Sequence, residues 1–134
     1  TAEEFPEYAA KTRAGTLVVP TVESEGALNE LDEILAIDEI ELVWLAAGDV
    51  TKILGVPFKY EDPKVMRLLE GAVKTAEQNG ASIMYNMGLD SPDFDSMAAA
   101  AKRLFNVGVR VVGLGAMEWH MQMALEHIRK NSID

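Results

Sequence analysis

Cysteine is absent from the 134 residues of this sequence, which excludes disulfide bonds, thiolate nucleophiles and thiolate metal sites. The absence also fits a reducing compartment. No apolar run approaches the roughly 18 residues that a membrane-spanning helix needs, and no signal-like apolar segment follows Thr1. We therefore expect a cytoplasmic protein, or an excised piece of one, without a membrane partner.

Basic residues are scarce relative to acidic ones. The chain has 12 Lys and Arg against 22 Asp and Glu, which gives a net charge of −10. So acidic a protein repels phosphate backbones, and nucleic acid is not expected as a partner. An anionic substrate would need a metal ion or oriented backbone amides. The length suffices for one domain with a core, and we treat residues 1–134 as a single unit.

Short apolar runs alternate with amphipathic segments along most of the chain. The runs predict strands over Thr16–Val22, Glu41–Ala47, Ala81–Tyr85 and Val109–Leu114. Because they are continuous, they are typical of strands buried on both faces of a parallel sheet. Helices are predicted over about 24–36, from Asp62-Pro63 to Asn79-Gly80, from Ser91-Pro92 onward and over about 116–130, with the end of an earlier helix at 3–13. The pattern is that of an α/β protein with four consecutive β-α units.

Strands that alternate with helices indicate a parallel sheet with right-handed crossovers. Two architectures fit: an open doubly wound sheet and part of a (β/α)8 barrel. In both, functional residues collect at the carboxyl ends of the strands. Four segments follow predicted strands in this way, and we expect them on one rim: Glu23, Gly48-Asp49, Asn86-Met87 and Gly113–Gly115.

Glu23 and Asp49 are carboxylates that end neighbouring predicted strands. Equivalent ends of adjacent parallel strands lie one strand spacing apart, within bridging distance of one ion. A hard divalent cation such as Mg2+ or Mn2+ suits two carboxylates, waters and substrate oxygens. A structural interpretation also fits, with Glu23 as a favourable acid in a first helical turn and Asp49 as a turn cap. Local spacing alone does not decide between them.

The segment TVES, followed one β-α unit later by AAGDVTKILGVP, resembles the metal-binding half of the HpcH/HpaI-type class II (metal-dependent) 2-oxo-acid aldolases. These enzymes belong to the barrel superfamily that includes citrate lyase β-subunits. In that family a Glu ending strand five and an Asp in a G-x-x-D-[LV]-[ST]-x-x-[LM]-G-x-P loop hold the ion. Glu23 and Asp49 match these two positions. The loop also matches at Thr51, Leu54, Gly55 and Pro57, and the resemblance runs from about residue 8 to 130.

The resemblance implies a lyase (aldolase) that cleaves or forms a carbon–carbon bond next to pyruvate, with an aldehyde as the other product or substrate. A divalent ion (Mg2+, Mn2+ or Co2+) would stabilise the pyruvate enolate. Glu23 and Asp49 are implied as metal ligands, and the backbone amides of Gly48 and Asp49 as donors to the pyruvate carboxylate. Thr21, also implied at the substrate, stands where the family usually has Gln, and Met117 stands where it often has Asp.

The resemblance also implies that half of a barrel is present. A full barrel needs about 250 residues, and this chain corresponds to strands five to eight, the C-terminal half of a (β/α)8 TIM barrel. The family's acid/base histidine and carboxylate-binding arginine lie in the other half. Four strands alone would expose two edges and a cut core. We therefore expect a fragment, a nicked product or one chain of a split enzyme, completed by an N-terminal half-barrel and inactive alone.

The last predicted helix carries apolar residues on more than one stripe. Relatives in this superfamily often exchange that helix between subunits, so we expect a homo-oligomer with an exchanged last helix; a broad core contact is the other interpretation. Two other functions remain open. One is an acyl-CoA lyase of the citrate lyase β type, for which this acidic chain offers little basic surface. The other is a non-catalytic assembly subunit, favoured by the departures at Thr21 and Met117.

Overall fold

The computed structural model of the protein describes residues 4–88, 94–115 and 117–132, with the backbone alone at 117–119. The elements are, in chain order, α1 (Phe5–Ala14), β1 (Thr21–Val22), α2 (Glu25–Asn29), α3 (Leu31–Leu35), β2 (Leu42–Leu45), α4 (Ala47–Ile53), α5 (Pro63–Gln78), β3 (Ser82–Asn86), α6 (Phe94–Val107), β4 (Val111–Gly113) and α7 (Met117–Ser132).

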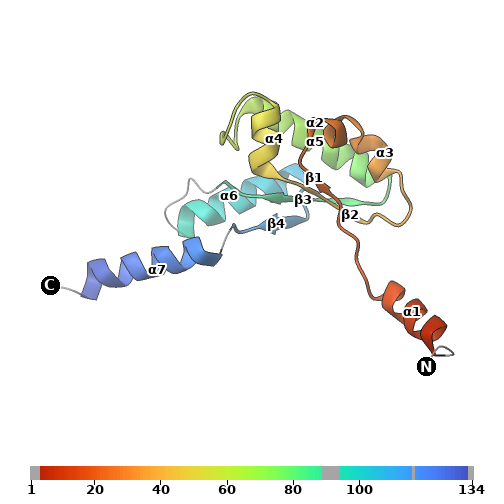
Figure 1. The fold of residues 1–134 in the computed structure, drawn as a ribbon. Coiled ribbons are helices and arrows are strands. Elements are labelled where there is room, and N and C mark those ends of the chain that lie inside the picture. The colour runs from red at the N-terminus through yellow and green to blue at the C-terminus, as the bar shows by residue number, and fades with distance from the viewer. Residues whose placement is uncertain (1–3, 89–93, 116, 133–134) are drawn as a thin grey trace.

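The four strands form one sheet in the order β1-β2-β3-β4, and every neighbouring pair is parallel. The register aligns Thr21, Trp44, Met84 and Val111 in one row across the sheet. Each strand is followed by one or more helices before the next strand (Figure 1). The predicted α/β class with a parallel sheet and four β-α units is confirmed.

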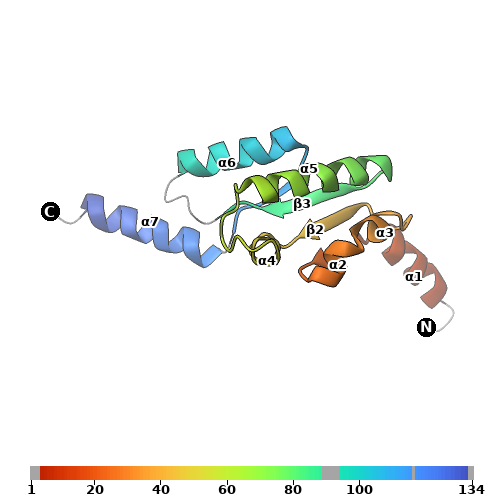
Figure 2. The ribbon, with the colours of Figure 1, turned by 90° about the horizontal axis from the view of Figure 1, so that it is seen from above.

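The core lies between one face of the sheet and a layer that contains α3, α5 and α6 (Figure 2). Helix α5 supplies an apolar stripe because its buried residues recur at helical spacing. The strands supply every second side chain, as the pleat of a strand requires. The fully buried residues include Val22, Val43, Leu45, Ile83 and Tyr85 from the strands and Val65 and Leu69 from α5.

The opposite face of the sheet carries side chains that are half-buried or exposed, apart from the buried Leu42 of β2. In β3, Ser82, Met84 and Asn86 are half-buried while Ile83 and Tyr85 are buried. The expectation of strands buried on both faces is therefore wrong for the structure described. The continuous apolar runs arise because the half-buried face is also apolar at several positions, such as Trp44 and Met84.

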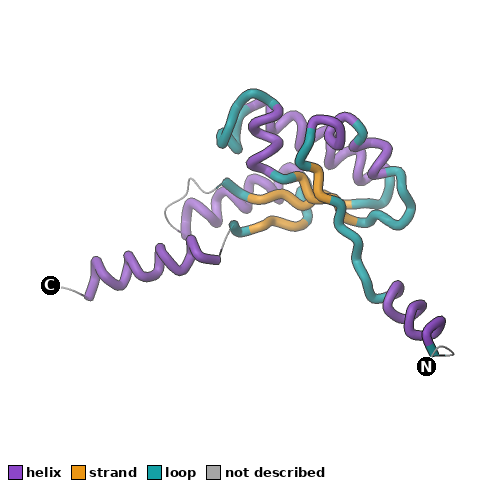
Figure 3. Tube along the Cα trace, viewed as in Figure 1, coloured by secondary structure: helices purple, strands orange, loops and turns teal. Residues whose placement is uncertain are grey.

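The first strand is shorter than predicted. Only Thr21 and Val22 of Thr16–Val22 form β1, and residues 16–20 run as a loop between α1 and the sheet (Figure 3). β1 is an edge strand, so the segment before it has a possible partner on one side only, and Pro20 has no N–H to donate. Leu17 and Val18 are consequently exposed.

Two helices differ from the prediction. The helix expected over 24–36 is broken at Glu30 into α2 and α3, and this bend turns Leu31 and Leu35 into the core while α2 buries no residue. The segment after β2, expected as a loop, begins with α4. Ala47, Val50 and Thr51 are buried on one side of this short helix, which explains why it forms.

The predicted ends of α5 are confirmed. Asp62 caps the helix by accepting a hydrogen bond from the Lys64 N–H at 2.9 Å, Pro63 occupies the first turn, and Gly80 takes a left-handed conformation after it. Ser91-Pro92, the predicted start of the next helix, lies outside the described residues.

Helices α1 and α7 extend away from the sheet on opposite sides in both ribbon views (Figures 1 and 2). They confirm the helices expected near 3–13 and 116–130. Helix α1 buries no residue, and α7 exposes Met121, Leu125 and Ile128. None of the described helices is both long and apolar enough to cross a bilayer.

Candidate active site

A cavity of about 420 Å3 lies at the carboxyl ends of the strands. All four strand ends contribute to its wall: Thr21 and Glu23 from β1 and the residue after it, Gly48 and Asp49 from α4, Asn86 from β3, and Gly115 after β4. The parallel sheet brings these residues together because its strands end at the same edge. The rim expected from the sequence therefore exists and is hollowed.

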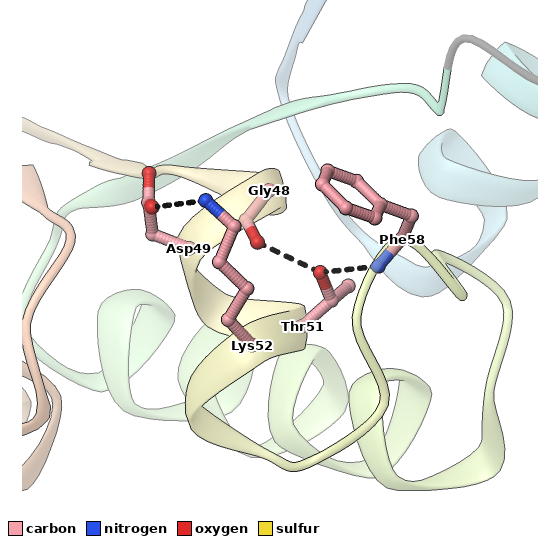
Figure 4. A network of polar contacts seen from close by, with 5 residues as sticks. All are labelled: Gly48, Asp49, Thr51, Lys52 and Phe58. Atoms are coloured by element: carbon pink, nitrogen blue, oxygen red, sulfur yellow. Dashed lines mark hydrogen bonds and ion pairs between the residues drawn. The ribbon is translucent and has the colours of Figure 1, made fainter.

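The Asp49 carboxylate pairs with a lysine of its own helix. Lys52 Nζ lies 3.1 Å from Asp49 Oδ1, and the two side chains are 54% and 45% exposed (Figure 4). Lys52 Nζ also lies 5.7 Å from the centre of the Phe58 ring. Because both charges face solvent, this pair is weak, and a cation with more charge can compete with it for Asp49.

The turn that carries Gly48 and Asp49 is fastened to the following loop by Thr51. The buried Thr51 hydroxyl donates to the Gly48 carbonyl oxygen at 2.8 Å and accepts from the Phe58 N–H at 3.0 Å (Figure 4). Phe58 has a φ of 61°, a left-handed conformation that is uncommon for a residue with a side chain. The geometry of the helix start thus depends on one hydroxyl group.

The two backbone amides implied for the substrate carboxylate differ in what they already bind. The Asp49 N–H donates to the Ala46 carbonyl oxygen at 3.0 Å. No described backbone oxygen accepts from the Gly48 N–H, which lies in the first turn of α4. A Cβ at Gly48 would meet no atom within 4 Å, so the glycine leaves space at the cavity wall.

Trp44 and Asn86 form a side-chain contact inside the same cavity wall. The indole N–H of Trp44 donates to Asn86 Oδ1 at 2.5 Å. The Asn86 amide also rests against Gly113, where an added Cβ would lie 2.7 Å from Asn86 Nδ2. Glycine is therefore required at position 113 for the amide to sit where it does.

The oxygen donors at the cavity fit a hard divalent ion. Glu23 and Asp49 supply two carboxylates, and Asn86 a carboxamide, with no soft donor among the residues that line the wall apart from Met87. Within residues 4–88, 94–115 and 117–132, no three His, Cys, Asp or Glu side chains gather into a metal-binding group. Two carboxylates suit an ion that keeps waters and binds substrate, and do not suit a closed structural site.

A second cavity of about 580 Å3 adjoins the first and shares Tyr60 and Met87 with it. Tyr85 lies at its wall, fully buried, and its hydroxyl has no hydrogen-bond partner among the described residues. Burial, and secondarily the nearby Tyr60, raises the pKa of Tyr85 well above its ordinary range. The phenol is therefore a neutral group at every physiological pH.

The structure brings together Thr21, Glu23, Gly48 and Asp49, the four site residues expected from the sequence. The side chain of Met117 lies outside the described residues. Sequence reasoning missed Trp44 and Tyr60. Trp44 could have been found from strand alternation, since it lies between the buried Val43 and Leu45 and must face the other way.

Comparison with known proteins gives a consistent picture. A sequence model described as HpcH/HpaI aldolase/citrate lyase matches residues 2–114. The chain is similar to 2-keto-3-deoxy-L-rhamnonate aldolase of Escherichia coli (strain K12), with 32% identity over 73 residues, which cover 54% of this chain and 27% of that protein.

Two solved structures share the fold. One is an HpcH/HpaI aldolase/citrate lyase family protein from Burkholderia cenocepacia J2315, with a TM-score of 0.73 and 19% identity, covering 90% of this chain and 44% of that chain. The other is an HpcH/HpaI aldolase from Desulfitobacterium hafniense DCB-2, with a TM-score of 0.70 and 18% identity, covering 97% and 48%. The chain thus spans less than half the length of the proteins it matches.

Proposed function

Because the chain belongs to the HpcH/HpaI aldolase/citrate lyase family, we propose that it carries the metal- and pyruvate-binding part of a class II lyase (aldolase) for 2-oxo acids. The observation that supports this most is that Glu23 and Asp49, which match the family's metal ligands, line one cavity at the ends of β1 and β2. Carboxylates at the ends of adjacent parallel strands lie one strand spacing apart, which is close enough for both to bind one divalent ion.

Glu23 and Asp49 hold the divalent ion, Mg2+ or Mn2+ with Co2+ as a further option, in this proposal. The ion supplies Lewis-acid stabilisation of the negative charge that develops on the substrate oxygen. Lys52 contacts Asp49 Oδ1, so an ion that binds this oxygen displaces the lysine. The cost is small because the pair is half exposed.

The substrate carboxylate binds at the start of α4. The Gly48 N–H is available, and the Asp49 N–H would have to be shared with the Ala46 carbonyl oxygen. Thr21 lies at the β1 side of the cavity, where its hydroxyl is shorter than the Gln side chain common in the family. These contacts orient pyruvate, and the aldehyde is the second substrate or product.

The sheet supports the proposal that this chain is the C-terminal half of a (β/α)8 barrel, strands five to eight. β1 and β4 are both edge strands, and the face opposite α5 is not covered by any described helix. An N-terminal half-barrel would cover that face and supply the acid/base group, so the chain alone is inactive. The exposed residues of α7 support a homo-oligomer in which this helix is exchanged.

A non-catalytic assembly subunit is the second candidate. It is favoured by the contact of Asp49 with Lys52, which already neutralises one of the two carboxylates, and by Thr21 in place of Gln. Such a subunit would keep the scaffold and would not bind the ion.

Metal binding separates the two candidates. The wild-type chain is titrated with Mn2+ and the free ion is measured by electron paramagnetic resonance. We expect Asp49→Asn and Glu23→Gln to weaken binding by more than tenfold, because each removes a charged ligand. Asp32→Asn, an exposed acid on α3, is the matched control and should bind as wild type does.

Equal Mn2+ affinity in wild type, Asp49→Asn and Asp32→Asn would favour the assembly subunit.

Catalysis is then tested with a complementary N-terminal half-barrel from the same family. Pyruvate-dependent turnover without coenzyme A supports the aldolase, while turnover that needs an acyl-CoA would replace it with a lyase of the citrate lyase β type.

A further inference from the structure

We propose that the Asn86 side-chain amide is a substrate-binding group, which donates a hydrogen bond to the carboxylate of the 2-oxo acid beside the Gly48 N–H. This inference rests on the proposed function and adds a residue to it. Asn86 ends β3, the strand next to β2, and Asp49 lies in the helix that follows β2. Asn86 lines the same cavity as Glu23 and Asp49.

The orientation of the Asn86 amide is fixed by Trp44. An indole N–H can only donate, so the group that faces it must be the amide oxygen of Asn86. The structure places Asn86 Oδ1 2.5 Å from Trp44 Nε1. The NH2 group is therefore the part of the amide that remains for a ligand, and it can only donate.

The position of the amide requires glycine at position 113. A side chain at 113 would begin 2.7 Å from Asn86 Nδ2 and 2.9 Å from its Cγ, closer than nonbonded atoms approach. The amide thus lies between an indole and a bare backbone at the cavity wall. A group held on two sides loses little rotational freedom when it binds a ligand.

A carboxylate at this place needs another donor. Of the two α4 amides, the Asp49 N–H already serves the Ala46 carbonyl oxygen, which leaves the Gly48 N–H. The register pairs Leu45 with Tyr85, so Asn86 follows directly across from Ala46, the residue that precedes α4. The Asn86 NH2 is the side-chain donor that this geometry brings to the same wall.

The neutral charge of the amide also suits the site. Glu23 and Asp49 make the cavity acidic, and a ligand carboxylate has to enter despite them. A lysine or arginine in place of Asn86 would attract that carboxylate but would also compete with a divalent ion for the two acids. An amide donor binds the ligand without that competition. The chemistry favours a short 2-oxo acid, whose carboxylate and carbonyl oxygens lie close together.

The test uses the 134-residue chain loaded with Mn2+ and titrated with oxalate, a planar dianion with adjacent oxygens. Mn2+ affinity is measured first by electron paramagnetic resonance, and oxalate affinity next by calorimetry. Asn86→Ala should weaken oxalate binding about tenfold, as expected for a lost hydrogen bond to a charged group, and change Mn2+ affinity less than twofold. Asn106→Ala, an exposed asparagine of α6, is the matched control and should change neither.

Asn86→Asp separates ligand binding from a structural role. Aspartate keeps an oxygen for the Trp44 N–H, so thermal stability and total tryptophan fluorescence should stay close to wild type, while oxalate binding falls further than in Asn86→Ala. Trp44→Phe should weaken oxalate binding by a smaller factor, because the amide loses its fixed orientation.

The outcomes distinguish the role of Asn86 from the metal site on which that role depends. Wild type that binds Mn2+ and oxalate, with Asn86→Ala unchanged in oxalate affinity, overturns the role of Asn86 and leaves the metal site standing. Oxalate binding restored to wild-type strength by Asn86→Asp also overturns it. Wild type that binds no Mn2+ removes the proposed function and the inference together.

Discussion

The Thr51 hydroxyl accepts a hydrogen bond from the Phe58 N–H, and this contact joins the helix that carries Asp49 to the loop that follows it. The same hydroxyl donates to the Gly48 carbonyl oxygen. One buried side chain therefore sets both the turn before Asp49 and the left-handed conformation of Phe58. Stability and site geometry are coupled at this position.

Thr51→Val should lower the free energy of unfolding by about 1–3 kcal/mol. Valine keeps the shape of threonine but leaves the part-buried Phe58 N–H without its acceptor, and a donor that loses its partner away from full solvent is costly. Urea denaturation of the chain gives the measurement. Thr51→Ser keeps the hydroxyl and should retain more of the Mn2+ affinity than Thr51→Val, so equal Mn2+ affinity in the two variants would contradict the coupling.

Lys52→Met should raise the affinity of the chain for Mn2+ by about two- to fivefold. The substitution removes a positive charge 3.1 Å from Asp49 Oδ1, and the effect stays modest because both groups are half exposed. Titrations at low and high salt should show the difference shrinking as salt increases. Lys74→Met, on the exposed side of α5, serves as the control. A drop in affinity in Lys52→Met would mean that Lys52 assists the site rather than competing for it.

Tyr85→Phe should leave the protein at least as stable at neutral pH, because the hydroxyl that it removes is buried without a partner among the described residues. Stability at alkaline pH provides a sharper test. Burial raises the pKa of Tyr85 in the folded chain, so above an unfolded-state pKa of about 10 the unfolded chain loses the proton first and stability falls as pH rises.

The wild type should therefore lose stability more steeply than Tyr85→Phe above about pH 10. Unfolding curves at a series of pH values measure both slopes. Tyr8→Phe, at an exposed tyrosine of α1, is the matched control and should follow the wild type. Parallel curves for wild type and Tyr85→Phe would show that another group controls the alkaline transition.

Leu125→Glu should shift the chain toward a smaller assembly. Met121, Leu125 and Ile128 recur at helical spacing along α7 and are each more than half exposed, so they offer an apolar stripe to a second copy. Sedimentation velocity over a range of concentrations measures the assembly. Gln122→Glu adds the same charge at an exposed polar position and should leave it intact. A wild type that stays monomeric at all concentrations would rule out the exchanged helix.

The sequence was sufficient where the controlling interactions are local. Helix α5 begins after Asp62 and ends before Asn79-Gly80, as predicted. The Asp62 cap, the fixed φ of Pro63 and the left-handed Gly80 each act within a few residues of the chain. The rim was predictable because parallel strands must end together, so Glu23 and Asp49 could be placed at one edge without knowing the register.

Other features depend on contacts between distant segments. The length of β1 depends on whether a strand lies on its free side, which the segment TLVVPTV does not encode by itself. The hydrogen bond from Trp44 to Asn86 requires the register of β2 on β3. The pair of Lys52 and Asp49 forms because α4 is helical, and that segment was expected to be a loop.

Within the described residues, β1 and β4 each have an outer edge with no strand beside it, which matters for the proposed separate half-barrel chain in a cell. Unpaired strand edges template further strand addition, so surplus copies that have no covering partner would tend to aggregate or be degraded. If the proposed N-terminal half-barrel is a separate chain, the two chains would therefore need to be supplied in matched quantity and timing. Co-expression that rescues its solubility would reveal that dependence before any activity is assayed.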